Sequence, residues 1–389
     1  MDKDKSSLLS SLDKEELFKL FSSFIESQKT VQKADSEPKA ENCANQVIEL
    51  WRNLNDETDL KTLINTISVK VFGKFLYTEA QFEYCFNADC NRYSTFEIPK
   101  RKPGKFRTIN APNPTLMGMQ QCLNYVFQQL YKPLDCATGF VPGRSIVDGA
   151  AVHLSQKFVY NIDLKDFFAN VTDQQLVNRL QTEPFGLSED MAKLVAIICC
   201  YKTKKSKCIL PQGAPTSPTI TNFICESLDR KLTKLASVYN LHYSRYADDI
   251  TFSGMQNIFA ANGRFCKSLK NIIEREEHFI INPAKTRLCH KGMRQEVTGL
   301  TVNQKLNVSR HYIKQLRVLL HNWEKNGYDI AQDEFLRHYN STKNIEGVHR
   351  IENIISGKLD YLKMVKGSKD STYLKLKARF EKLMERRPK

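Results

Sequence analysis

The stretch Tyr243-Ser-Arg-Tyr-Ala-Asp-Asp-Ile-Thr-Phe-Ser-Gly254 contains an adjacent pair of aspartates between two runs of alternating apolar residues. Such alternation predicts two β-strands joined by a tight turn that presents Asp248 and Asp249. Aspartates also favour turns for local hydrogen bonding alone, so the pair could have no further role. Two neighbouring carboxylates beside aromatic strands nevertheless repel each other unless a cation neutralises them. The stretch therefore predicts a hairpin with a cation site at its turn.

A third carboxylate stands earlier in the chain, in Phe158-Val-Tyr-Asn-Ile-Asp-Leu-Lys-Asp-Phe-Phe168. Asp163 comes at the end of an apolar run that predicts a strand, just before a turn or helix. Three carboxylates that meet at strand ends could hold two Mg²⁺ ions for in-line phosphoryl transfer. We therefore expect Asp163, Asp248 and Asp249 to lie together.

The charge of the chain points to a polyanionic partner. The 389 residues carry a formal net charge of +15, although residues 1–60 are net acidic. The basic side chains gather in clusters near 100–107, 202–207 and 285–294, and the last 89 residues are also basic. Separated basic patches are typical of proteins that contact nucleic acid at several places. Solvated lysines on an ordinary surface remain the alternative.

Other features bear on the cellular location. The longest uncharged run, between Lys207 and Glu226, is interrupted by prolines, so no membrane-spanning helix is expected. The first residues show neither a basic leader nor an apolar segment, which argues against secretion. Eleven cysteines without a CxxC pair indicate reduced thiols rather than disulfides or a structural zinc. We expect a cytoplasmic protein that does not bind membranes.

The patterning divides the chain into three regions. Residues 1–95 are expected to form a helical N-terminal extension with a polar linker near 28–45. Residues 96–305 alternate strand-like and helical runs. Residues 306–389 are expected to be helical, with Ser309 as the first N-cap and further helices over 330–340, 345–365 and 371–386.

Five segments together resemble the reverse transcriptase family, in the order that this family uses. They are Lys102-Pro-Gly-Lys-Phe-Arg107, Asp163-Leu-Lys-Asp-Phe-Phe168, Leu210-Pro-Gln-Gly-Ala-Pro-Thr-Ser-Pro218, Tyr246-Ala-Asp-Asp249 and Asn282-Pro-Ala-Lys285. The resemblance covers about 99 to 305 and implies an α+β right-hand polymerase. Such a fold has fingers, a palm with an antiparallel sheet and a helical thumb.

The resemblance also implies roles for individual residues. Two Mg²⁺ ions would be held by Asp163, Asp248 and Asp249 together with the carbonyl of Leu164. The incoming nucleotide would be bound by Lys102 (or Lys100), Arg107, Phe168, Gln212, Gly213 and Lys285. Phe168 would act as a steric gate against a ribose 2′-OH, whereas Phe167 is expected to be a core residue.

Two further segments resemble signatures of the bacterial retron reverse transcriptases. Val297-Thr-Gly299 is similar to a Val-Thr-Gly signature, and Gly149-Ala-Ala-Val-His153 to Asn-Ala-x-x-His, with Gly149 in place of Asn. The resemblance implies RNA binding by His153, Val297, Thr298 and Gly299. The basic side chains of the first thumb helix are expected to contact RNA phosphates; they are Arg310, Lys314 and Arg317. The short region after the thumb begins argues against an RNase H or endonuclease domain.

The sequence therefore predicts an RNA-directed DNA polymerase. By resemblance, it would copy a dedicated structured non-coding RNA, which also serves as primer, into a branched RNA–DNA hybrid (msDNA) in an antiphage defence system. The implied partners are this RNA, the hybrid product, dNTPs, an accessory effector protein and a host RNase H. Alternatives are a non-retron defence-associated or intron-derived reverse transcriptase, and a polymerase-fold protein that mainly holds RNA or a toxin.

Overall fold

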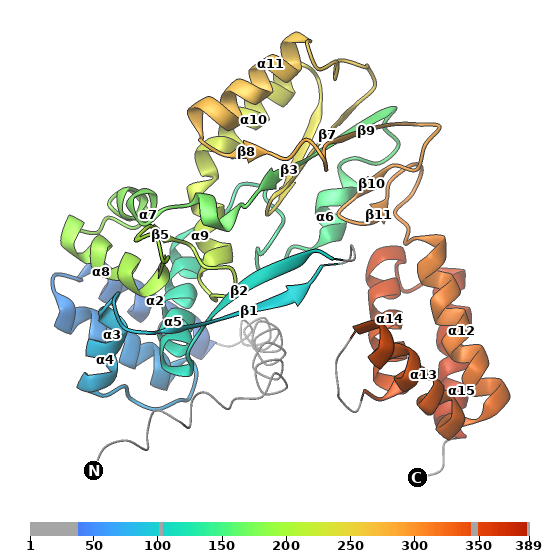
Figure 1. Ribbon diagram of the computed structural model, residues 1–389, viewed down its shortest axis with the longest axis horizontal. Helices are drawn as coiled ribbons and strands as arrows, with labels where there is room; N and C mark the ends of the chain where they lie inside the picture. Colours follow the sequence, from blue (N-terminus) through green and yellow to red (C-terminus); the bar gives the residue numbers. More distant parts are fainter. Residues whose placement is uncertain (1–37, 101–103, 344–348, 387–389) are drawn as a thin grey trace. The chain divides into compact units, whose positions relative to one another are not determined.

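The computed structural model describes residues 38–100, 104–343 and 349–386. Of these, the larger of two compact units takes residues 31–145 and 158–288 of the chain as far as they are described, and the smaller takes 146–157 and those from 289 onward. The larger unit contains an antiparallel sheet (Figure 1). The strands run in the order β6 (His242–Tyr246), β7 (Asp249–Gly254), β3 (Phe158–Lys165) and β8 (Ile280–Ile281), and β9 (Arg287–His290) also pairs with β3. Tyr246 pairs with Asp249 across the β6–β7 hairpin, and Asp163 pairs with Asp249 across β3 and β7. The predicted hairpin and its turn are thus confirmed.

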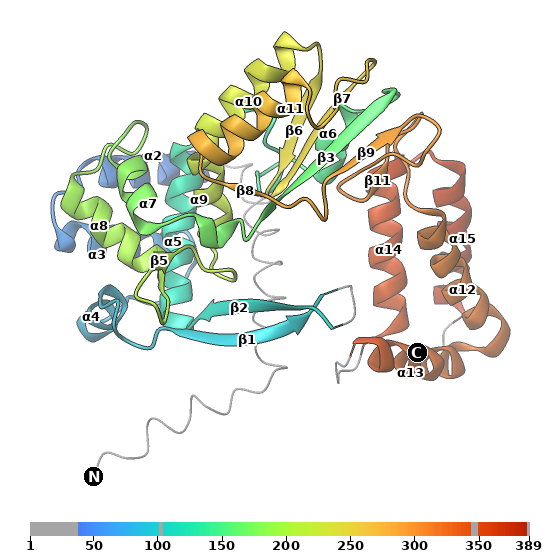
Figure 2. The same ribbon diagram turned by 45° about the horizontal axis from the view of Figure 1, so that its top comes forward.

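Helices α10 (Glu226–Val238) and α11 (Arg264–Lys270) cover one face of this sheet (Figure 2). Aromatic rings connect the layers: Tyr243 stacks on Phe252 with centroids 5.0 Å apart, and Phe252 meets Phe265 edge-on at 5.2 Å. All three residues are buried. Offset and edge-on aromatic pairs stabilise beyond their buried area, so the hairpin rests on a well-packed base.

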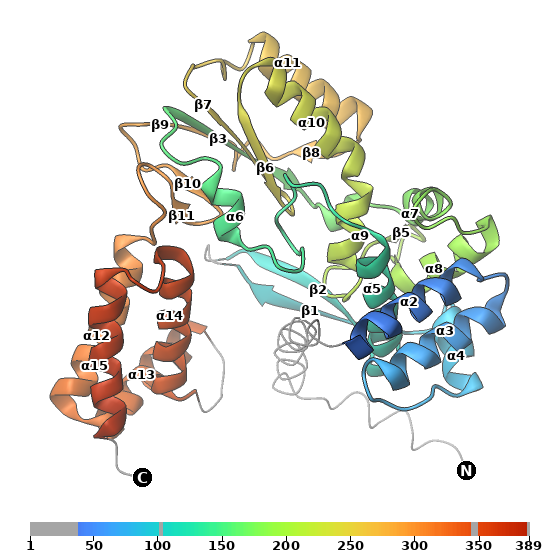
Figure 3. The same ribbon diagram turned by 180° about the vertical axis from the view of Figure 1, so that it is seen from behind.

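A helical subdomain of the same unit surrounds the long helix α5 (Pro114–Leu130) (Figure 3). Its other helices are α2 (Pro38–Arg52), α3 (Glu57–Lys70), α4 (Glu79–Phe86), α7 (Asp173–Leu180), α8 (Glu189–Cys199) and α9 (Ser217–Ile224). Local sequence defines their starts: Asp56 and Asp59 form a reciprocal capping box at α3, and Asn113 caps α5 just before Pro114. Trp51, Phe127 and Phe185 meet in the core.

A two-stranded hairpin, β1 (Tyr93–Pro99) and β2 (Phe106–Pro112), extends from this subdomain. Its register pairs Ile98 with Arg107, and its tip, residues 101–103, lies outside the described residues. The buried guanidinium of Arg92 donates to the carbonyls of Cys85 and Ile197 at the base of β1. A second short hairpin consists of β4 (Tyr201–Lys202) and β5 (Cys208–Ile209).

In the described residues, the smaller unit contains α6 (Ile146–Ala151), the hairpin β10 (Glu296–Val297) and β11 (Leu300–Thr301), and four C-terminal helices. The helices are α12 (Arg310–Asn326), α13 (Tyr328–Lys343), α14 (Ile351–Lys366) and α15 (Ser371–Glu385). Ser309 accepts a hydrogen bond from the backbone N–H of Tyr312 at 3.1 Å, as expected of an N-cap. The predicted C-terminal helices are therefore confirmed.

One expectation, the extent of the polar linker, differs from the structure. Helix α2 begins at Pro38, so residues 38–45 of the expected linker are helical. Proline is favoured at the first helical position, and Lys, Ala and Glu are good helix formers, although the first turns lack an apolar pattern. The chain also passes from one compact unit to the other between residues 288 and 289, and the β10–β11 hairpin packs with α6 in the smaller unit. The expected boundary at 305 between the palm and the thumb stays a prediction. The expected helix within residues 1–27 lies outside the described residues.

Candidate active site

The β6–β7 turn brings the three predicted carboxylates together. Because Tyr246 pairs with Asp249, the turn consists of Ala247 and Asp248 alone. Ala247 has a φ of 53°, in the left-handed region that alanine rarely adopts. The backbone N–H of Leu164, next to Asp163 in β3, donates to the carbonyl of Asp248 at 3.0 Å. This bond ties the turn to the strand that carries the third carboxylate.

The cluster is electrostatically unfavourable on its own. Burial against the protein raises the pKa of Asp249 to about 6, although part of the residue is open to solvent, and repulsion from Asp248 and Asp163 adds to the shift. Burial and the charge of Asp163 also raise the pKa of Asp248. Like charges disfavour ionisation of their neighbours, and a cation would relieve that cost. The site is therefore suited to bind positive charge.

Two side chains from the segment after β8 bind Asp163. The ammonium of Lys285 lies 2.6 Å from Oδ2, and the Asn282 side-chain amide donates to Oδ1 at 2.9 Å. The Asn282 backbone N–H also donates to the Asp163 carbonyl at 2.8 Å. The resemblance assigns Lys285 to the nucleotide and gives Asn282 no role, although both lie in the Asn-x-x-Lys element. Because Asn282 and Lys285 stand three residues apart in one element, a contact of Lys285 with the carboxylate cluster would have pointed to Asn282 as a second partner.

The donor chemistry fits a magnesium ion. Mg²⁺ prefers carboxylate oxygens, and Asp163, Asp248 and Asp249 supply them. Within the described part of the chain, however, no group of three or more His, Cys, Asp or Glu side chains is already arranged to hold a metal. The Asp163 oxygens point instead to Lys285 and Asn282. To bind a metal ion, Asp163 would have to give up at least its contact with Lys285.

The predicted nucleotide-binding residues occupy neighbouring segments of the larger unit. Arg107 is exposed on β2, and its charge favours the ionised form of Asp248. The Gln212 carbonyl accepts from the backbone N–H of Asn110 at 2.9 Å. Gly213 has a φ of +134°, and a Cβ there would lie 2.9 Å from the Asn110 carbonyl oxygen, so only glycine fits. Lys102 lies outside the described residues.

The two phenylalanines after Asp163 differ as expected. Phe167 is buried and its ring packs against Phe279 with centroids 5.6 Å apart. Phe168 begins a short 3₁₀ turn (Phe168–Asn170) and is partly exposed. Phe167 is therefore the core member of the pair, and the role of Phe168 as a gate stays a prediction.

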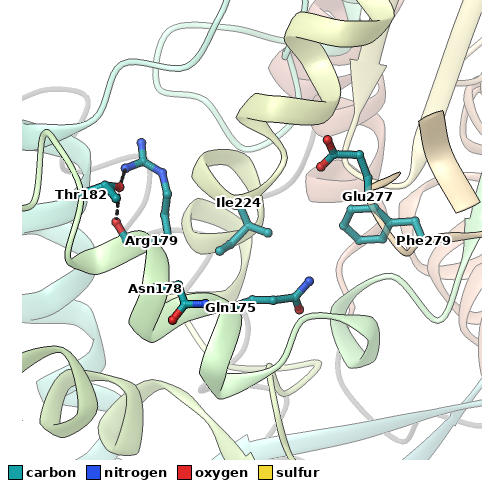
Figure 4. A pocket seen from close by; sticks show the side chains of 7 residues that line it. All are labelled: Gln175, Asn178, Arg179, Thr182, Ile224, Glu277 and Phe279. Atoms are coloured by element: carbon teal, nitrogen blue, oxygen red, sulfur yellow. Dashed lines mark hydrogen bonds between the residues drawn. The ribbon is translucent and has the colours of Figure 1, made fainter. Parts of the chain in front are cut away.

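The larger unit also has a pocket that includes none of the predicted site residues (Figure 4). It is lined by Gln175, Asn178, Arg179, Thr182, Ile224, Glu277 and Phe279. Arg179 donates to Thr182 beside it at 2.8 Å and pairs with Glu226 at 3.0 Å. The lining groups thus already have protein partners, and we assign the pocket no role in the site.

The predicted RNA-binding residues all lie in the smaller unit, and the side chains of two of them, His153 and Val297, are buried there. A direct contact of these two side chains with RNA would require them to leave the core of that unit. Thr298 and Gly299 form the accessible β10–β11 turn, with the Thr298 hydroxyl 3.5 Å from the Ile146 carbonyl of α6. Their contact with RNA stays a prediction.

The three basic residues assigned to the first thumb helix are exposed on α12. Arg310, Lys314 and Arg317 lie on the side away from the buried Leu316, Leu320 and Trp323.

In the described residues, no helix is both long and apolar enough to cross a membrane.

An antiparallel sheet that presents three carboxylates at a hairpin and on the adjacent strand, beside a basic two-stranded hairpin, defines a polymerase-type palm. Residues 98–323 match the family described as reverse transcriptase (RNA-dependent DNA polymerase). This chain belongs to that family.

Its relatives include several retron enzymes. The chain is 36% identical to the retron Mx65 reverse transcriptase of Myxococcus xanthus, over 59% of this chain and 55% of the relative. It is 36% identical to the retron Mx162 reverse transcriptase of the same organism, over 60% and 53%. It is 32% identical to the retron Ec86 reverse transcriptase of Escherichia coli, over 66% and 74%. The predicted resemblance to retron enzymes is confirmed, and the chain spans about half the length of the two Myxococcus relatives it matches.

Proposed function

We propose that this protein is an RNA-directed DNA polymerase that copies a dedicated structured non-coding RNA. The RNA would also provide the primer, so the product would be a branched RNA–DNA hybrid (msDNA). The observation that carries this proposal is the meeting of Asp163, Asp248 and Asp249 on β3 and the β6–β7 hairpin. A protein that only held RNA would have no need for three mutually repelling carboxylates.

The residues of the site would divide the work of nucleotide addition. Asp163, Asp248, Asp249 and the Leu164 carbonyl would hold two Mg²⁺ ions, which when bound stabilise charge on the transferred phosphoryl group. Arg107, with Lys102 near the hairpin tip, would bind the triphosphate, because a guanidinium suits bidentate contact with phosphate oxygens. Lys285, once released from Asp163, would contribute a positive charge on the same side. The Gln212–Gly213 backbone would approach the nucleotide closely, and Phe168 would face its sugar.

The division into regions and the partners belong to the same proposal. Residues 96–305 would form fingers and palm, and 306–389 a thumb whose Arg310, Lys314 and Arg317 bind RNA together with Thr298 and Gly299. The partners would be the structured RNA, dNTPs, the hybrid product, a host RNase H that trims it and an accessory effector in antiphage defence. Eleven unpaired cysteines favour a reducing cytoplasm as the location.

The test is template-dependent DNA synthesis by the purified protein with its co-expressed RNA. The RNA is sought as an inverted repeat in the DNA upstream of the reading frame. We expect labelled dNTP to enter a product that remains joined to RNA after denaturation. RNase should digest its RNA only as far as the branch nucleotide, whose 2′-OH is occupied by the link to DNA, and DNase should remove the labelled strand. Tight RNA binding without any incorporation, at all Mg²⁺ and Mn²⁺ concentrations, would favour a binding protein instead.

A further inference from the structure

A fully buried ion pair lies behind the hairpin that carries the catalytic carboxylates. The Arg245 side chain is 0% exposed and the Asp229 side chain 2%. Arg245, on β6, donates through Nε to Asp229 Oδ1 at 2.8 Å and through Nη2 to Oδ2 at 2.7 Å. Asp229 lies on α10, so this bidentate pair connects the covering helix to the strand.

The remaining donor groups of Arg245 reach the turn and a second helix. Nη1 donates to the carbonyl of Ala247 at 3.3 Å, and Nη2 also reaches Oδ1 of Asn222, on α9, at 3.3 Å. The other side of the Asn222 amide donates to the Gly139 carbonyl at 2.9 Å. Gly139 itself lies so near the turn that a Cβ there would be 2.7 Å from the Ala247 nitrogen. One guanidinium thus links two helices to the residue that precedes Asp248.

Stability alone does not account for such a pair. Removing two charges from water is costly, and a buried pair often adds nothing net over apolar residues of similar size. The pair also stands beside Ala247, whose left-handed backbone is less favourable than an ordinary conformation. A strained backbone persists only where its surroundings hold it, and such positions cluster at functional sites.

We propose that Arg245, oriented by Asp229, is a positioning residue for DNA synthesis. It holds the Ala247 carbonyl, fixes the turn, and so sets where Asp248 and Asp249 stand relative to Asp163. The inference rests on the proposed polymerase function. Arg245 acts through the two-residue turn of Ala247 and Asp248, and not by contact with nucleotide or metal. A planar guanidinium is required, because Lys has a single point charge and cannot serve Asp229 bidentately while reaching Ala247.

The experiment compares three variants of the full chain with its RNA. Arg245→Lys keeps the charge and loses the fork. The double variant Arg245→Met, Asp229→Leu replaces the pair by apolar groups and leaves no unpaired charge. The matched control is Arg179→Met, which removes a partly buried arginine that also pairs with a carboxylate, that of Glu226, and donates to backbone carbonyls, those of Phe223 and Glu183. None of these Arg179 partners belongs to β6, β7 or their turn.

Each protein is measured in three ways: melting temperature, Mn²⁺ binding without nucleotide by electron paramagnetic resonance, and single-dNTP incorporation resolved into kcat and KM. We expect both Arg245 variants to bind Mn²⁺ about tenfold more weakly and to lose kcat by about tenfold to a hundredfold, because small misplacements of catalytic groups have costs of this size. KM for dNTP should change little. The control should share any loss of melting temperature and retain metal affinity and kcat.

Metal affinity and kcat like those of the control in the folded double variant would overturn the proposal. If an Arg245 variant fails to fold, Asn222→Ala takes its place, since it removes one contact of the same guanidinium and leaves the ion pair. It should weaken Mn²⁺ binding in the same direction, and wild-type affinity there would equally count against the positioning role. An unmodified protein that binds Mn²⁺ but never incorporates dNTP would instead refute the polymerase function.

Discussion

At the scale of single residues, the carboxylate cluster should make the stability of the protein depend on pH. The pKa of Asp249 is raised from an ordinary 3.8 to about 6, so the folded state holds a proton that the unfolded chain has lost between these values. In EDTA the free energy of unfolding should therefore fall as the pH rises from about 4 to about 6. Asp249→Asn, which has no charge to bury, should melt higher than the unmodified protein at pH 7.5. Melting curves over this range should show the difference vanish below about pH 4, and a constant difference would contradict it.

The same carboxylates are expected to be indispensable for synthesis. Asp248→Asn should leave the melting temperature nearly unchanged and lower dNTP incorporation by several orders of magnitude, because an amide cannot replace a carboxylate as a metal ligand. Asp166→Asn is a suitable control: Asp166 is exposed, has a φ of 50° that Asn tolerates, and lies outside the cluster. Steady-state incorporation measures both. Near-normal synthesis by Asp248→Asn would remove the basis of the site.

Sugar discrimination should depend on Phe168 and not on Phe167. A ring packed against C2′ of the incoming nucleotide leaves no room or hydrogen bond for an additional hydroxyl. Phe168→Ala should therefore raise the incorporation of rNTP relative to dNTP. Phe167→Ala should instead lower the melting temperature, since truncation of a buried Phe costs about 3–5 kcal/mol. Competition between the two nucleotides in single additions checks both variants. Unaltered discrimination in folded, active Phe168→Ala would refute the gate.

At the scale of elements, the segment before α6 supports the β6–β7 hairpin from its free edge. The Arg245 backbone N–H donates to the Cys136 carbonyl at 2.8 Å, and the Thr138 N–H donates to the Arg245 carbonyl at 2.9 Å. The following residue, Gly139, meets the turn backbone, so a methyl group there can be accommodated only if the hairpin moves. The segment thus acts as a short additional strand beside β6.

Gly139→Ala should therefore lower synthesis more than stability. A displaced turn would shift Asp248 and Asp249 away from Asp163, and we expect a loss of about tenfold or more in kcat. Gly357→Ala, a control inside α14 with open space around its Cα, should be neutral to slightly stabilising. Incorporation rates and melting temperatures of the two variants are compared. Full activity of Gly139→Ala would show that the turn tolerates displacement.

The elements also show what a sequence can and cannot predict. Alternation around Asp248 and the apolar run before Asp163 predicted both strands, and the structure adds the register that places Asp163 opposite Asp249. Periodicity is local, however, and the partners of a buried polar group are not. Asn282 binds an aspartate 119 positions earlier, and Arg245 pairs with Asp229 on a different element. Nothing in either local pattern indicates these contacts.

At the scale of the whole molecule, the basic charge is distributed over both units, each of which carries predicted contacts to a polyanion. In the larger unit, Arg107 lies on the β1–β2 hairpin and Lys285 at the carboxylate cluster. In the smaller unit, the exposed face of α12 carries Arg310, Lys314 and Arg317 over about two helical turns. Contacts to phosphates add affinity without reading sequence, so both surfaces would suit one structured RNA.

Charge reversal on α12 separates specific phosphate contact from general attraction to a basic protein. Changing Arg310, Lys314 and Arg317 together to Glu should weaken RNA binding and lower the slope of log K against log salt by about 2, since each lost phosphate contact removes about 0.7–0.9. The control reverses Lys363, Lys369 and Lys375, which are exposed in the same unit and give the same change in net charge. Filter binding from low to moderate salt measures both slopes. If the slope of log K against log salt falls equally in both triple variants, the α12 face has no special contact with RNA. A decrease confined to the Arg310, Lys314 and Arg317 variant assigns the α12 face to binding the template.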